Sequence, residues 1–167
     1  YGWANLSNTP YRLFKQYDHE GGIHTPMIAQ WPDKIKKKGS ISHTLSHLVD
    51  LMPTILEASD ITPTSKIRGH ERLPWDGRSI LPSIEGKKQK DPPLLFFSHA
   101  RGKALRVGNW KLVFNKDHKK EAKWELYDMK SDPNELIDLA ENKPNKVRQL
   151  AQLWQQEENE HLRKSQL

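Results

Sequence analysis

A lysine that precedes an acid–glycine–glycine turn is the feature of this 167-residue chain with the clearest chemical potential. Lys15 comes five residues before Glu20, and the pair Gly21–Gly22 follows at once. Glycine adopts backbone angles that other residues resist, so the chain can turn sharply here and carry Lys15 back toward the next segment. Residues 25–29 are mostly apolar and predict a short strand that a proline ends. The arrangement favours an anion-binding rim, and a solvated lysine beside an ordinary turn is the alternative.

Three further stretches follow the lysine segment, and their sequences and order support the first interpretation. The four stretches are KQYDHEGGIHTP at 15–26, VDLMPTILE at 49–57, LRVGNWKLV at 105–113, and WELYD at 124–128 with Asp132 and Pro133 after it. Together they resemble the sulfatase family along almost the whole chain. In that family the lysine contacts the sulfate group being transferred, so the resemblance assigns this catalytic contact to Lys15.

The resemblance also implies a fold and a division into parts. Sulfatases have an α/β fold of the alkaline-phosphatase-like type, and this chain would contain only the C-terminal part of it. Residues 1–61 would be the remnant of the large α/β domain, and residues 62–93 the connecting segment. Residues 94–167 would form a small α+β domain with a four-stranded antiparallel sheet and a C-terminal helix.

Local patterns in the second half of the chain support the small domain. Apolar runs predict four strands, at 94–98, 104–107, 110–114 and 124–127. The dipeptide Gly108–Asn109 is suited to the two-residue turn of a hairpin. After Pro144, apolar residues recur at i, i+3, i+4 and i+7, and they predict an amphipathic helix that covers one face of the sheet.

The first half predicts a helix from Leu51 to about residue 59, with Asp50 as a good N-cap. Its apolar residues at helical spacing predict a face packed in a core. His43 and His47 are four residues apart, as in a zinc-binding pair on a helix. Polar and apolar residues alternate around them, however, which favours a strand and argues against a metal site.

A loop between the first two predicted strands of the small sheet has residues suited to substrate recognition. In sulfatases the corresponding turn can face the catalytic pocket. Here it contains His99 and Arg101, whose imidazole and guanidinium groups can donate hydrogen bonds to sugar hydroxyls, carboxylates or sulfates. An exposed hairpin loop with incidental basic residues is an equal alternative.

The sequence lacks the residues that perform sulfatase chemistry. The family uses a formylglycine, made in a C/S-x-P-x-R motif, beside a divalent cation, expected to be Ca²⁺, held by Asp and Asn residues. The chain has no cysteine and neither a Ser-x-Pro-x-Arg nor an Asp-Asn-Gly segment. Both cofactors are therefore expected from an upstream part of a longer protein, and no metal is expected to bind this chain. By itself the chain should not catalyse, because one lysine replaces neither nucleophile nor metal.

Three functions are compatible with these observations. The first is the C-terminal part of a hydrolase acting on sulfate esters of sugars or aryl alcohols. The second is a phosphodiester or phosphonate hydrolase of the same superfamily, which an unmodified upstream Thr or Ser would indicate. The third is a stand-alone basic module that binds glycans or nucleic acid.

The net charge of +6 favours anionic partners, and a sulfated small molecule or polysaccharide is the expected one. The lysines lie in short runs without a recognition helix or interleaved aromatic residues, so nucleic acid is not expected. No apolar stretch is long enough for a membrane span. Self-association through the N-terminal segment is a further expectation, because an apolar strand without neighbours exposes unpaired backbone groups. The family resemblance alone predicts a periplasmic or secreted location.

Overall fold

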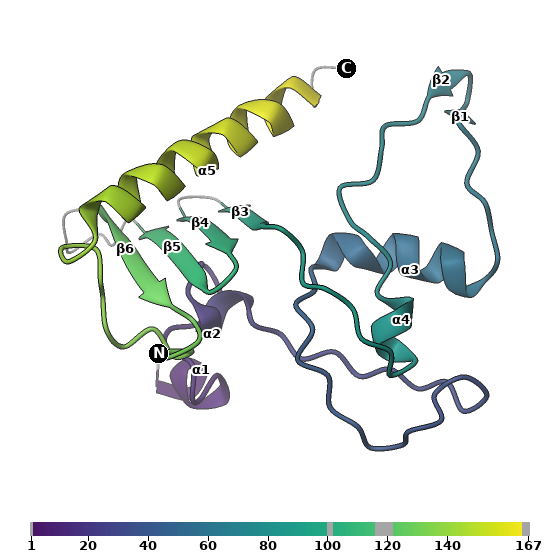
Figure 1. Ribbon diagram of the computed structural model, residues 1–167, viewed down its shortest axis with the longest axis horizontal. Helices are drawn as coiled ribbons and strands as arrows, with labels where there is room; N and C mark the ends of the chain where they lie inside the picture. The colour runs from purple at the N-terminus through teal and green to yellow at the C-terminus, as the bar shows by residue number, and fades with distance from the viewer. Residues whose placement is uncertain (1, 100–101, 116–121, 165–167) are drawn as a thin grey trace. The chain divides into compact units, whose positions relative to one another are not determined.

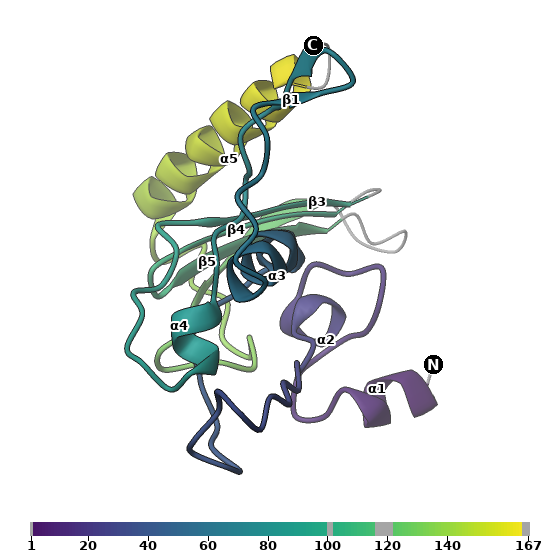
Figure 2. The same ribbon diagram turned by 90° about the vertical axis from the view of Figure 1, so that its right-hand side faces the viewer.

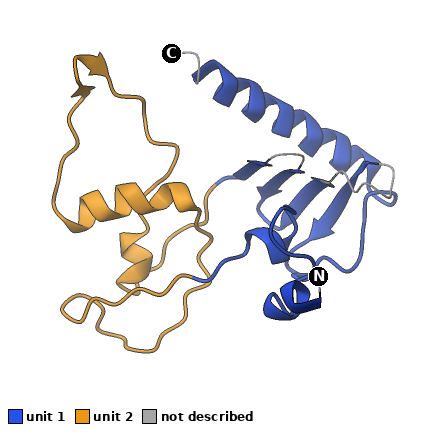
Figure 3. Cartoon of the chain, turned by 180° about the vertical axis from the view of Figure 1, so that it is seen from behind, with its two compact units in different colours: residues 1–26, 93–167 blue, residues 27–92 orange. Residues whose placement is uncertain are grey.

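The computed structural model describes residues 2–99, 102–115 and 122–164, and the chain divides into two compact units. Unit 1 comprises residues 1–26 and 93–167, and unit 2 comprises residues 27–92 (Figure 3). The chain's own contacts thus group its first 26 residues with the C-terminal half. The assignment of residues 1–61 to the large domain of a longer enzyme stays a prediction.

Unit 1 is built on a four-stranded antiparallel sheet in the order β3-β4-β5-β6 (Figure 1). The strands are β3 (Leu95–His99), β4 (Gly102–Val107), β5 (Trp110–Asn115) and β6 (Lys123–Asp128). All four predicted strands are confirmed, and Val107 pairs with Trp110 across the predicted hairpin turn. Gly108 has a φ of +57° there, a left-handed conformation that glycine adopts at no steric cost.

Helix α5 (Pro144–Lys164) covers one face of the sheet, as the apolar spacing predicts. Figure 2 shows α5 along one side of the strands. The core between them contains Leu105, Leu112, Leu126, Leu150 and Trp154. The indole Nε1 of Trp154 donates a hydrogen bond of 3.0 Å to the carbonyl of Phe97, so this large side chain is buried without an unsatisfied polar atom.

Residues 12–24, which contain α2 (Glu20–Ile23), cover the opposite face of the sheet. Helix α1 (Gly2–Ser7) precedes them. Figure 2 shows α2 on the side of the sheet away from α5. Ala104, Val113 and Tyr127 point to this face and are buried. The expectation that the N-terminal segment lacks neighbours within the chain is therefore wrong for residues 12–24, because Arg12, His19 and Glu20 contact side chains of the small sheet.

Unit 2 is held around one buried carboxylate at the start of a helix. The unit contains η1 (Leu48–Asp50), α3 (Leu51–Ala58), a ladder of β1 (Lys66–Ile67) and β2 (His70–Glu71), and α4 (Leu81–Ile84). Asp50 accepts hydrogen bonds of 2.8 Å from the backbone N–H groups of His47 and Arg78. The predicted helix is confirmed, but Met52 and Ile55 are 50% and 57% exposed, so its expected core face is uncovered in this chain.

Two predicted strands of the first half do not form. Residues 25–29 have no regular structure, and Ile28 is 95% exposed. A strand needs a neighbour to satisfy its backbone groups, and none of the described residues pairs with this segment. The segment with His43 and His47 is also irregular, and the His47 side chain accepts a hydrogen bond from the N–H of Val49 at the start of η1. No helix in the described part is long and apolar enough to cross a membrane.

Candidate functional site

Lys15 is an exposed residue of a partly buried loop whose two ends meet at the glycine pair. The N–H of Gly21 donates a hydrogen bond of 3.1 Å to the carbonyl of Arg12. A Cβ on Gly21 would lie 2.3 Å from that carbonyl oxygen, and one on Gly22 would lie 1.9 Å from the carbonyl oxygen of Tyr17. Both positions therefore require glycine, because the loop backbone folds directly onto them. The chain does reverse here, but through the helical turn α2, and neither glycine has the positive φ that the sequence predicts; glycine is needed for the close backbone approach instead.

The loop backbone is strained on both sides of the lysine. Leu13 has a φ of +67° and Gln16 a φ of +85°, conformations that side-chained residues rarely adopt. Glu135, which lies beneath the loop, has a φ of +58°. Each such residue costs on the order of 1 kcal/mol and persists only where its surroundings over-determine it. The contacts that do so lie on the sheet.

A fully buried lysine on β5 anchors the end of the loop. The ammonium Nζ of Lys111 lies 2.6 Å from Oε1 of Glu20 and 2.7 Å from Oε1 of Glu135, the second contact being an ion pair without hydrogen-bond geometry. Oε2 of Glu135 accepts a hydrogen bond of 2.8 Å from the N–H of Glu20. The other oxygen of Glu20 contacts Nδ1 of His24 at 2.7 Å. Glu20 is thus held at its backbone and at both carboxylate oxygens.

A second polar cluster lies beside the first, on β6. Oε2 of Glu125 contacts Nε2 of the buried His19 at 2.7 Å and accepts a hydrogen bond of 2.7 Å from the hydroxyl of Tyr127. Arg12 donates to that hydroxyl at 2.9 Å and to the carbonyl of Glu135 at 2.8 Å. Because Arg12 precedes Lys15 and Glu20 follows it, both ends of the loop are fastened to the same face of the sheet.

The electrostatics of the two clusters favour the ionised forms of Glu20 and Glu125. Burial alone raises the pKa of Glu20, but the hydrogen bonds from His24 and Lys111 and the charge on Lys111 outweigh burial and lower the pKa to about 2. Glu125 behaves alike: burial opposes its charge, and the contacts with His19 and Tyr127 lower its pKa to about 2. Burial and the neighbouring Glu125 raise the pKa of Tyr127, which therefore remains a neutral donor.

Asp18 differs from these glutamates, because its buried Oδ2 accepts no hydrogen bond. Its carboxylate lies against Gly102, where a Cβ would be 2.2 Å from Oδ2. Burial raises the pKa of Asp18, although the charges of His99, Lys111 and His19 act in the other direction.

The expected recognition loop is only partly described. His99 is exposed at the end of β3 and pairs with Gly102 on β4, whereas Arg101 lies outside the described residues. No hydrogen bond or ion pair joins Lys15 to His99 among the interactions of the described residues. Nor do the described residues include a group of three His, Cys, Asp or Glu side chains that could hold a metal ion.

Sequence reasoning singled out Lys15 but assigned no role to the charges that hold its loop. Glu20 and Lys111 both belong to the family-like stretches, yet nothing in their spacing indicates that they meet. The sequence did contain one indication. Lys111 lies two residues before the buried Val113 on β5, so both side chains point to the same face of the sheet, where an apolar residue is expected. A lysine at such a position needs an acidic partner.

Comparison with known proteins assigns the chain to a family. The family model described as N-sulphoglucosamine sulphohydrolase, C-terminal, matches residues 11–164. The chain belongs to the sulfatase family. The matched range includes both the lysine loop and the sheet that anchors it, so the two clusters lie within the region that the family model describes.

Curated relatives agree with the family model. An uncharacterised sulfatase of Schizosaccharomyces pombe is 32% identical over 91% of this chain and 28% of its own length. The N-acetylgalactosamine-6-sulfatase of Canis lupus familiaris is 33% identical over 65% of this chain and 19% of its own. Choline-sulfatase of Rhizobium meliloti is 29% identical over 77% of this chain and 24% of its own. The chain thus spans less than a third of the length of these relatives.

Solved structures share the fold of the chain. A Bacteroides thetaiotaomicron protein of a locus for glycosaminoglycan metabolism superposes with a TM-score of 0.67 at 22% identity, over 87% of this chain and 31% of its own. Ps i-CgsB superposes with a TM-score of 0.64 at 20% identity, over 90% of this chain and 34% of its own. The expected α/β sulfatase fold, with its four-stranded antiparallel sheet and C-terminal helix, is confirmed.

Proposed function

We propose that this chain is the C-terminal part of a sulfuric ester hydrolase, in which Lys15 contacts the sulfate group that is transferred. One observation carries the proposal: Lys15 is exposed on a strained loop whose ends are fastened to the sheet at Arg12 and Glu20. A solvated surface lysine needs no such support. A lysine that must meet a reacting group does, because transition-state stabilisation depends on donors held in place beforehand.

In this proposal the ammonium of Lys15 stabilises negative charge on the nonbridging sulfuryl oxygens. Formylglycine would supply the nucleophile and the divalent cation a Lewis acid, and both would belong to the upstream part of the protein. The described residues do not provide a donor set for the cation. The chain alone is expected to be inactive.

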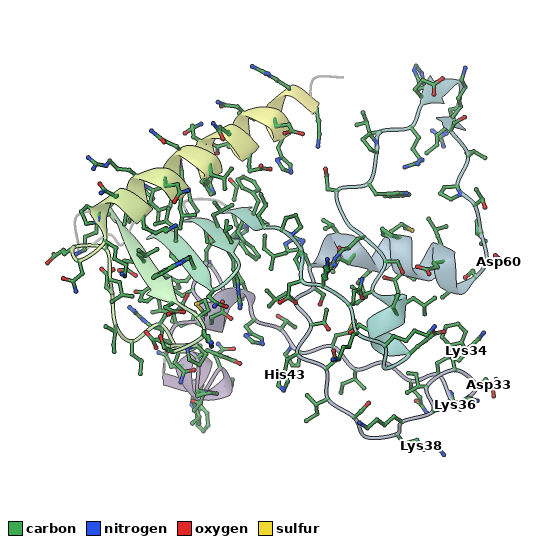
Figure 4. All side chains as sticks on the ribbon, in the orientation of Figure 1. Asp33, Lys34, Lys36, Lys38, His43 and Asp60 are labelled. Carbon is green, nitrogen blue, oxygen red and sulfur yellow. The ribbon has the colours of Figure 1, made fainter. Side chains whose placement is uncertain are left out.

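The substrate class follows from the relatives and from the charge of the chain. Relatives are named for N-acetylgalactosamine-6-sulfate and choline sulfate, so a sulfated sugar or another sulfate ester is the proposed substrate. The exposed Lys34, Lys36 and Lys38 project from one loop of unit 2 (Figure 4) and would attract a polyanionic glycan. His99 and Arg101 are proposed to contact the substrate beyond the sulfate. A periplasmic or secreted location remains a prediction from the family.

The exposed apolar residues of unit 2 indicate a surface that another part of the full-length protein covers. Ile28, Met52 and Ile55 are each at least half exposed. We propose that the rest of the large domain covers them in the full-length protein, and that the isolated chain self-associates through them. Patches of this kind mark interaction surfaces or aggregation sites.

The test compares ester classes in the full-length protein. Turnover of 4-nitrophenyl sulfate should exceed turnover of bis-4-nitrophenyl phosphate, and Lys15→Ala should lower kcat/KM for the sulfate about a hundredfold or more. Lys130→Ala, which removes an exposed lysine of unit 1 that has no proposed role, is the matched control and should stay within about threefold of wild type. Preference for the phosphodiester would favour the related phosphodiester or phosphonate hydrolase. Glycan binding by this chain without any turnover of the full-length protein would favour the basic module.

A further inference from the structure

Lys111 is an unusual residue to find on the inner face of a sheet. Its side chain is 1% exposed, and its charge faces two glutamates. Buried ion pairs seldom stabilise a fold more than apolar side chains of similar volume, because both charges lose their hydration. The benefit of Lys111 is therefore geometric. It fixes the positions of the two carboxylates that it contacts.

Those carboxylates control the loop of Lys15. Glu20 is the residue at which the loop ends, and the next N–H, that of Gly21, closes the loop on the carbonyl of Arg12. Glu135 accepts the N–H of Glu20, and its own carbonyl accepts from the guanidinium of Arg12 at 2.8 Å. One ammonium group thus orders both ends of the loop through two short chains of contacts.

The anchored ends maintain a strained backbone conformation in the loop between them. Leu13 and Gln16 lie between the two anchored ends, on either side of Lys15, and Glu135 is strained where it meets Lys111. Without the ion pairs, the backbone can relax to ordinary angles, and Lys15 then moves. A displacement of about 1 Å of a group that acts on the transition state can cost about a hundredfold in rate.

We propose that Lys111 is a positioning residue, which acts on sulfate-ester hydrolysis by holding the Lys15 loop through Glu20 and Glu135. The inference rests on the proposed function of Lys15. It extends the set of functional residues from the lysine loop to the small sheet, about a hundred residues further along the chain. Lys111 itself touches neither the substrate nor the reacting atoms.

The experiment is a double-mutant cycle between Lys111→Met and Lys15→Ala in the full-length protein, with 4-nitrophenyl sulfate as substrate. Methionine keeps the length of the side chain and removes the charge. Lys111→Met should lower kcat about tenfold or more and leave KM within about threefold, because Lys15 acts mainly on charge that develops in the transition state. In the Lys15→Ala background, the same change should cost less than about threefold, since there is no lysine left to misplace.

Lys103→Met is the matched control. It removes a lysine from β4 whose Nζ lies 4.1 Å from the ring centroid of Trp154, on the face toward α5, and it should behave alike in both backgrounds. If Lys111→Met does not fold, Glu20→Gln serves in the same cycle, because it removes one charge of the pair and keeps the side-chain shape. A loss of folded enzyme alone lowers kcat by the same factor with or without Lys15.

Each outcome decides between the claims. A loss that shrinks in the Lys15→Ala background supports positioning. An equal loss in both backgrounds, or a Lys111→Met enzyme within threefold of wild type while Lys15→Ala is impaired, overturns the positioning role and leaves the function of Lys15 intact. If Lys15→Ala is as active as wild type, the proposed function of Lys15 itself fails.

Discussion

Nζ of Lys111 lies 2.6 Å from Oε1 of Glu20, although the two residues are 91 positions apart in the sequence. One belongs to the stretch LRVGNWKLV and the other to KQYDHEGGIHTP. Two of the stretches that carry the family resemblance thus meet as a buried ion pair beneath the lysine loop. The pair explains why a loop near the N-terminus packs with the C-terminal sheet.

Glu20 makes stability depend on pH, because its hydrogen bond with His24 and its contacts with Lys111 favour the ionised carboxylate against burial. The pKa of Glu20 falls from about 4.5 in an unfolded chain to about 2 in the fold, so folding favours its ionised form. The resulting stabilisation is complete above about pH 4.5 and is lost as the pH falls toward 2. Glu20→Gln should lower the free energy of unfolding at pH 7 by on the order of 2–4 kcal/mol, as measured by urea denaturation.

The same variant should flatten the pH dependence of stability between pH 4.5 and 2. Glu71→Gln is the control, since Glu71 forms an exposed pair with Lys66 at 3.1 Å and should change stability by less than about 1 kcal/mol. Equal losses of stability in the two variants would contradict a special role for the buried pair.

Asp18 should have the opposite pH dependence. Burial raises the pKa of its carboxyl group, so folding disfavours the ionised form, and stability is lost as the pH rises through the raised pKa. Asp18→Asn removes the buried charge and should raise the Tm at pH 7. The gain should fade below about pH 4, where wild-type Asp18 is protonated. A Tm that falls at pH 7 would mean that the charge of Asp18 is needed by His19, His99 or Lys111.

Gly22 should not tolerate a side chain. A Cβ there would lie 1.9 Å from the carbonyl oxygen of Tyr17, which is backbone and cannot move without opening the loop. Gly22→Ala should destabilise the chain by on the order of 2 kcal/mol or more. Gly2→Ala is the matched control, because a Cβ at this position would have no atom within 4 Å, and the substitution should leave stability unchanged. Similar thermal unfolding curves for the two variants would show that the loop is not closed on Gly22.

The elements with strong local patterns could be predicted from the sequence. The hairpin at Gly108 and the helix after Pro144 depend on turn chemistry and on apolar periodicity, which are properties of neighbouring residues. The prediction of a strand at residues 25–29 was wrong. A strand needs a neighbouring strand to satisfy its backbone groups, and its own residues do not show whether one is present. The contacts of Lys111 were missed for the same reason. Two residues that form an ion pair but lie far apart in the sequence have no characteristic spacing that would predict their contact.

The isolated 167-residue chain should show no turnover of 4-nitrophenyl sulfate above a buffer blank, because Lys15 provides only part of the charge stabilisation and no nucleophile. A fluorescent or coloured product assay of the purified chain checks this. Turnover that follows the chain through purification and disappears in Lys15→Ala would contradict the account of an upstream catalytic centre.

The central claim is that the C-terminal sheet holds the lysine loop, and amide hydrogen exchange of this chain in dilute solution tests it most directly. The N–H groups of Gly22 and His24 each donate a backbone hydrogen bond of 2.8 Å, whereas Ile28 lies in the irregular segment. We predict that Gly22 and His24 exchange more slowly than Ile28, that Lys111→Met removes this protection, and that Leu112 stays protected in both proteins. Exchange of Gly22 and His24 as fast as that of Ile28 in the wild-type chain would contradict the claim.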